Sequence, residues 1–151
     1  MLNITHQVVT KKEWPIVYEI EKEMSNHPLY YTFTDKDQFN EFMGKSKVFL
    51  LKYDGKIAGY CSYEMKNKDL AEINGMVVLE PFRGKGLGTY AVNLLMDNLK
   101  KIKTVMLVTH PENNISLRLY LKFGFVIKKW RDNYINNQPR LVLYKDNYQS
   151  S

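Results

Sequence analysis

The chain alternates short apolar runs with polar turns, a pattern typical of a sheet with helices packed on it. Apolar runs of strand length lie at residues 4–9, 48–53, 56–63, 70–79, 104–109, 125–127 and 140–144. Between them, apolar residues recur at helical spacing and predict four helices. The buried sides of these helices are expected at Ile16, Ile20 and Met24, at Phe39, Phe42 and Met43, at Leu87, Ala91, Leu94, Leu95 and Leu99, and in the segment around Ser116. The predicted order is β-α-α-β-β-β-α-β-α-β-β.

Turn residues sharpen this assignment at three places. Asp54-Gly55 between two strand-like runs indicates a two-residue hairpin with positive φ at both turn positions. Thr34 and Asp37 indicate the start of the second helix. The polar residues 136–139 predict a turn between the last two strands.

The length and the element order together predict the fold class. The chain has 151 residues, the size of one ordinary domain, and no repeat or linker divides it. An antiparallel meander that meets a parallel β-α-β unit gives a mixed sheet with helices on both faces. We therefore expect an α/β fold (an α+β mixed sheet), with residues 1–151 forming a single domain.

Arg83-Gly84-Lys85-Gly86-Leu87-Gly88 is the most informative stretch, because it joins a predicted strand to a predicted helix. Glycine lets the backbone approach a ligand closely, and the first turn of a helix offers free N–H groups at the positive end of its dipole. This arrangement binds phosphate. A P-loop is excluded, because Gly86 follows Lys85 and no Ser or Thr holds the metal-binding position. A dinucleotide fingerprint would end on Thr89, or on Ala91 well inside the helix. The alternative is a tight turn that binds nothing.

A second motif follows the next predicted strand. It has the form N-x-x-[AS]-x-x-x-Y-x-K-x-G-F and comprises Asn113, Ser116, Tyr120, Lys122, Gly124 and Phe125. With V-V-x-x-P and R-x-x-G-x-G upstream, the chain resembles the GNAT superfamily of acyl-CoA-dependent N-acetyltransferases, closely over residues 70–130 and in layout elsewhere. The resemblance implies the GNAT fold. It also implies transfer of an acetyl group from acetyl-CoA to a primary amine, by direct attack in a ternary complex.

The resemblance also implies which residues bind acetyl-CoA. It assigns the pyrophosphate to backbone N–H groups of the glycine loop, with Arg83 as an added charge; these residues are Gly84, Lys85, Gly86, Leu87, Gly88 and Thr89. It implies that the pantetheine arm pairs with the backbone of a strand made of Met76, Val77 and Val78. Asn113 is expected to contact the same arm, and a simple helix N-cap is its alternative role.

Two catalytic roles follow from the same resemblance. Tyr120 matches the tyrosine near the thioester sulfur, where a phenol can protonate the departing thiolate. Glu72 stands where some members carry a catalytic glutamate, and an ordinary outward-facing carboxylate is the alternative. Members that modify protein N-termini can use a glutamate on the next strand, and that position is Val108 here. The missing glutamate favours a second hypothesis, a non-catalytic acyl-CoA-binding regulatory module, whereas the presence of Tyr120 opposes it.

The acceptor site is expected between the first two helices and the last hairpin. Its candidate lining is mainly aromatic and consists of Tyr30, Tyr31, Phe33, Glu64, Tyr134 and Arg140. Such a lining is compatible with a polyamine, an amino acid, an aminoglycoside or a peptide.

Composition narrows the remaining possibilities. The net charge is +6, from 22 basic and 16 acidic residues, but the lysines are dispersed and form no nucleic-acid-binding motif. Coenzyme A, itself a polyanion, accounts for part of the positive excess. The single cysteine, Cys61, is expected to be a small buried hydrophobe. We expect a cytoplasmic enzyme without a metal, a membrane span or a nucleic-acid partner, and the sequence leaves a homodimer open.

Overall fold

The computed structural model describes residues 3–25, 27, 29, 33, 35–135 and 137–147. Its centre is one seven-stranded sheet with the spatial order β1-β2-β3-β4-β5-β7-β6. The strands are β1 (Ile4–Val8), β2 (Ser46–Tyr53), β3 (Lys56–Asn67), β4 (Leu70–Val78), β5 (Thr104–Thr109), β6 (Val126–Ile135) and β7 (Gln138–Asp146). Neighbouring strands are antiparallel except β4 and β5, which run parallel. This mixed sheet confirms the predicted fold class.

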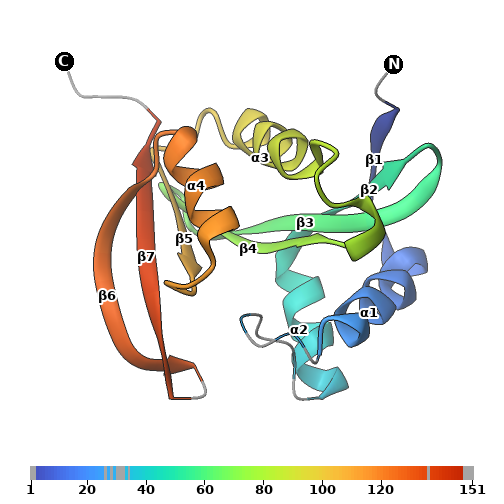
Figure 1. Ribbon diagram of the computed structural model, residues 1–151, viewed down its shortest axis with the longest axis horizontal. Coiled ribbons are helices and arrows are strands. Elements are labelled where there is room, and N and C mark those ends of the chain that lie inside the picture. The colour runs from blue at the N-terminus through green and yellow to red at the C-terminus, as the bar shows by residue number, and fades with distance from the viewer. Residues whose placement is uncertain are drawn as a thin grey trace.

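Within the described residues, four α-helices cover the two faces of the sheet, as Figure 1 shows. They are α1 (Trp14–Glu23), α2 (Lys36–Lys45), α3 (Leu87–Asn98) and α4 (Asn114–Lys122), with short 3₁₀ turns at Lys11–Glu13 and Glu80–Phe82. One buried cluster joins α3 and α4 to the sheet, and a second cluster joins α1 and α2 to it. The observed order of strands and helices is the predicted one.

The hairpin was predicted correctly, and so were the buried sides of the helices except at Ile16. Ile16 is 38% exposed, and its neighbour Val17 is the buried residue in this turn of α1. Asp54 and Gly55 have φ of 50° and 79°, so both turn positions have positive φ. Phe39, Phe42 and Met43 are buried on α2. On α3, Leu87, Ala91, Leu95 and Leu99 are buried, whereas Leu94 is half-buried.

The helix α2 starts at Lys36, between the two residues that indicated its start. Its N-cap is Asp35, whose side chain accepts a hydrogen bond from the Gln38 N–H at 2.8 Å. Asp37 instead lies in the first turn of the helix, where a carboxylate is favoured by the dipole. The predicted start residue Thr34 lies outside the described residues.

The predicted turn at 136–139 was too long. Asn136 lies outside the described residues, and Asn137 has a φ of 59°. Gln138 and Pro139 already belong to β7. Pro139 is tolerated because it stands at the start of the strand, where a missing N–H costs little pairing.

Candidate active site

A β-bulge at Asn74 shapes the middle of β4. Ser62 of β3 pairs with Gly75, and the next residue, Tyr63, pairs with Ile73, so Asn74 has no partner across the strands. The Asn74 amide accepts a hydrogen bond from the Ser62 hydroxyl at 2.7 Å and donates one to Ser46 at 2.9 Å. These two contacts hold Asn74 in the bulge.

Glycine is required beside this bulge. A Cβ atom at Gly75 would lie 2.3 Å from the Ser62 Oγ and 2.7 Å from a ring carbon of Tyr60. The extra residue also reverses which side chains face which helices. Ile73 packs with the α3–α4 cluster, whereas Val77 packs with the α1–α2 cluster. The bulge thereby turns the second half of β4 relative to its first half.

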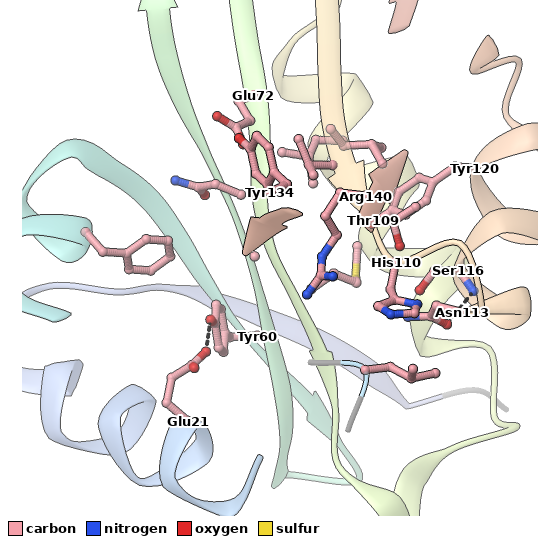
Figure 2. A pocket seen from close by; sticks show the side chains of 18 of the residues that line it. Glu21, Tyr60, Glu72, Thr109, His110, Asn113, Ser116, Tyr120, Tyr134 and Arg140 are labelled. Atoms are coloured by element: carbon pink, nitrogen blue, oxygen red, sulfur yellow. Dashed lines mark hydrogen bonds between the residues drawn. The ribbon is translucent and has the colours of Figure 1, made fainter. Parts of the chain in front are cut away.

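The sheet opens beside the bulge. β4 and β5 pair only over Leu70–Ile73 and Thr104–Leu107, while β5 stays paired with β7 as far as Thr109. A cavity of about 310 Å³ lies at this opening, as Figure 2 shows. Its wall comes from both faces of the sheet and includes Glu21, Leu29, Phe33, Phe42, Tyr60, Glu72, Ile73, Asn74, Gly75, Met76, Leu107, Val108, Thr109, His110, Asn113, Ser116, Tyr120, Tyr134 and Arg140.

The glycine loop lies where β4 ends and α3 begins. Gly84 and Gly86 have φ of 76° and 90°, and a Cβ at Gly84 would meet nothing within 4 Å. The first turn of α3 starts at Leu87, whose N–H, like those of the next two residues, has no preceding helical carbonyl. The loop therefore offers open backbone donors, which is the geometry that a phosphate needs.

Individual residues of the glycine loop have different structural roles. The Arg83 Nε donates to the Val78 carbonyl at 3.0 Å and ties the loop to the end of β4. The Leu87 side chain is buried in the core, whereas Thr89 is exposed. A Cβ at Gly88 would lie 3.2 Å from Leu119, so the glycine allows α3 to approach α4 closely.

Tyr120 and Asn113 reach the cavity from α4 and its N-terminus. The Asn113 side chain accepts a hydrogen bond from the Ser116 N–H at 3.2 Å and caps the helix. Tyr120 is 4% exposed, and burial, with a smaller contribution from the nearby Cys61, raises the pKa of its hydroxyl. The raised pKa favours the protonated phenol. Within the described part of the chain, that hydroxyl has no hydrogen-bond partner, so its proton is available to a ligand in the cavity.

Glu72 lies on the cavity wall beside a lysine. Its carboxylate is 3.3 Å from the Lys66 ammonium, and its side chain is 19% exposed. Burial raises the pKa of Glu72, and the positive charge of Lys66 partly opposes this shift. Lys66 also contacts Glu64 at 3.2 Å. The carboxylate is therefore partly buried, unlike that of an ordinary glutamate that points into solvent.

The predicted acceptor residues divide into three groups. Phe33, Tyr134 and Arg140 line the cavity. Glu64 does not; it lies in a neighbouring hollow, where Lys45 approaches its carboxylate at 3.7 Å. The predicted residues Tyr30 and Tyr31 lie outside the described residues.

The structure adds two residues to the predicted site, Glu21 and His110. Glu21 of α1 is 4% exposed and accepts a hydrogen bond from the Tyr60 hydroxyl. His110, 7% exposed, follows the end of β5, and its Nδ1 accepts a hydrogen bond from the Glu112 N–H at 3.0 Å. A signal for Glu21 existed, because it lies four residues after Val17 on the buried face of α1.

Cys61 takes no part in the cavity wall. It is completely buried in the α3–α4 cluster, and burial raises the pKa of its thiol to about 12. A thiol in this state is not a nucleophile near neutral pH. The prediction of a small buried hydrophobe is confirmed.

A bulged strand, a parallel pair that separates and a glycine-rich helix N-terminus together form the arrangement that the motifs implied for an N-acetyltransferase. The model of the acetyltransferase (GNAT) family matches residues 14–125, and the chain belongs to this family. A curated relative, an uncharacterized N-acetyltransferase from Methanocaldococcus jannaschii, is 30% identical over 94 residues. The match covers 54% of this chain and 42% of that protein, so the chain spans less than half of the relative's length.

Two solved structures share the fold. A GNAT family acetyltransferase from Elizabethkingia anophelis with acetyl-CoA bound has a TM-score of 0.78 and 22% identity, covering 95% of this chain and 98% of that one. The ribosomal-protein-S18-alanine N-acetyltransferase from Escherichia coli has a TM-score of 0.82 and 21% identity, covering 98% and 96%. At these identities the likeness concerns the fold.

Proposed function

We propose that residues 1–151 form one domain that transfers an acetyl group from acetyl-CoA to a primary amine in a ternary complex. The observation that carries this proposal is the cavity at the separation of β4 and β5. It brings Glu72, Tyr120 and the backbone around Met76 to one space. A proton acceptor, a proton donor and strand N–H groups are the groups that acetyl transfer from a thioester needs.

The residues present fit acetyl-CoA, which supplies the activated acetyl thioester. Open N–H groups from Gly84 to Thr89 suit the pyrophosphate, because nothing within 4 Å would meet a side chain at Gly84. The strand residues Met76, Val77 and Val78 pair with β3 on one edge but lie beyond the last residue of β4 that pairs with β5. The edge of β4 that faces away from β3 is therefore available to the pantetheine arm. Asn113, the N-cap of α4, and Ser116 in the first turn of that helix also line the cavity.

The chemistry balances with the groups of this chain. The ammonium of the acceptor first loses a proton to the Glu72 carboxylate, directly or through a water molecule. The amine nitrogen then forms a bond to the acetyl carbon, and the carbon–sulfur bond breaks. Tyr120 donates its proton to the departing sulfur, since its raised pKa keeps the phenol protonated. The products are an acetamide and the free thiol of coenzyme A.

A non-catalytic acyl-CoA-binding module is the second candidate, because Val108 lines the cavity where some family members carry a glutamate. Release of thiol from acetyl-CoA in the presence of pooled amines separates the two functions. We expect thiol release by the wild-type protein and a rate about 10²-fold lower in Tyr120→Phe, because the phenolic proton is lost without a large change in volume. A calorimetric titration should give both proteins the same affinity for coenzyme A. Coenzyme A binding without thiol release would contradict the enzymatic function.

A further inference from the structure

Arg140 presents a buried positive charge to the cavity. The residue is 5% exposed, although it lies on the cavity wall contributed by β7. Within the described residues, the only hydrogen bond of its side chain runs from Nη1 to the adjacent Pro139 carbonyl at 2.9 Å. Guanidinium has five N–H donors, so most of them remain for another partner. Figure 2 shows the guanidinium projecting into the middle of the cavity.

No protein carboxylate neutralises this charge in the described part of the chain. The ion pairs there involve other residues, and burial alone lowers the pKa of Arg140. The two carboxylates on the cavity wall have other contacts: Glu72 pairs with Lys66, and Glu21 accepts a hydrogen bond from Tyr60. Burying a charge without a counterion costs free energy. Binding of an anionic group of a ligand to Arg140 would offset this cost.

His110 adds a second donor next to Arg140. Thr109 pairs with Leu141, so His110 and Arg140 are the next residues at the adjoining ends of β5 and β7. The His110 Nδ1 accepts the Glu112 N–H, so a neutral ring carries its proton on Nε2. Such a ring can donate a hydrogen bond from Nε2.

Resting on the proposed function, we infer that the acetyl acceptor is a small amino acid in which Arg140 binds the carboxylate while the amine faces the thioester. A planar guanidinium matches a carboxylate through two parallel hydrogen bonds. The cavity of about 310 Å³ is at the small end of ligand pockets and also has to admit the acetyl end of the donor. The first residue of a peptide has a neutral amide in place of the carboxylate, so it would leave Arg140 without a counterion.

The test compares each common amino acid with its own amide, which differs only in the carboxylate. We expect the wild-type protein to acetylate at least one amino acid with a kcat/KM more than tenfold above that of its amide. Arg140→Met keeps most of the volume and removes the charge. It should lower kcat/KM for the amino acid by about 10²-fold, mainly through KM, and leave the amide unchanged.

Arg131→Met is the matched control, because Arg131 pairs with Arg140 across β6 and β7 but is exposed. It should retain the wild-type preference. If Arg140→Met fails to fold, two measurements still test the inference. One is the preference of the wild-type protein for amino acids over their amides, and the other is the same preference in Arg140→Lys. Equal rates for acid and amide, or a preference for aspartyl or glutamyl peptides over every free amino acid, would overturn the inference. Failure to acetylate any amine, despite binding of acetyl-CoA, would instead refute the proposed function itself.

Discussion

The neighbours of Glu72 set the pKa of its carboxyl group. Burial on the cavity wall disfavours the charged carboxylate, whereas the Lys66 ammonium at 3.3 Å favours it, and the net effect is a raised pKa. A carboxyl group with a pKa above its ordinary value accepts a proton more readily near neutral pH. These contacts support Glu72 as the proposed base.

Glu72→Gln tests this role through the pH dependence of kcat. Since only the carboxylate accepts a proton, the wild-type rate should fall as pH drops through the raised pKa of Glu72. The variant should be slow near neutral pH and should recover as pH rises, because more amine then arrives deprotonated. A rise in KM for the amine with unchanged kcat would mean that Glu72 only binds the acceptor. Wild-type kcat and KM at every pH would remove Glu72 from the site.

At the residue scale, the sequence predicts a site residue when that residue belongs to a motif with fixed spacing. Tyr120 and Asn113 could be assigned because they stand in register with Ser116 and Gly124. Glu21 and His110 carry no such register, and only tertiary packing brings them to the cavity. Glu64 was placed in the acceptor site by its position in β3, but the Lys66 and Lys45 contacts hold it in the neighbouring hollow.

At the element scale, the N-terminus of α3 is expected to bind the pyrophosphate. Thr89→Glu should change phosphate binding without disturbing the fold, because Thr89 is exposed in the first turn of the helix. A carboxylate in the first turn interacts favourably with the helix dipole, so the melting temperature of the variant should stay the same or rise. The same charge repels phosphate, so affinity for coenzyme A should fall by about tenfold or more, and less at high salt. Calorimetry at two salt concentrations measures both effects.

Thr89→Gln is the control for this prediction, since it adds similar bulk without charge. Equal affinities of the Glu and Gln variants for coenzyme A would show that phosphate does not approach this turn. A Gly86→Val variant is less informative, because Gly86 has a φ of 90°, which strains any branched side chain.

The elements themselves were predictable where local chemistry dominates. The Asp54-Gly55 hairpin follows from turn preference, and both of its turn residues have the expected positive φ. The prediction was incomplete for β6, which extends to Ile135 although residues 131–134 are exposed and form no apolar run. An edge strand is held by backbone pairing with β7, and its side-chain pattern therefore indicates its length poorly.

At the scale of the whole molecule, the opening in the sheet is the decisive feature. An unbroken sheet would keep the side chains of its two faces apart. Because β4 and β5 separate, Glu21 of α1 and Tyr120 of α4 line the same cavity although their helices cover opposite faces. Under the proposed function, the acceptor and the acyl donor meet in this cavity. No helix within the described residues has the length and apolar character to cross a membrane.

The most direct test of the account follows the acetyl group itself. The protein is incubated with acetyl-CoA labelled in the acetyl group and with the amino-acid panel, and both products are quantified by mass spectrometry. The account predicts one labelled N-acetyl amino acid for each coenzyme A thiol released. Release of thiol without an acetylated amine, or no turnover at saturating acetyl-CoA, would contradict it.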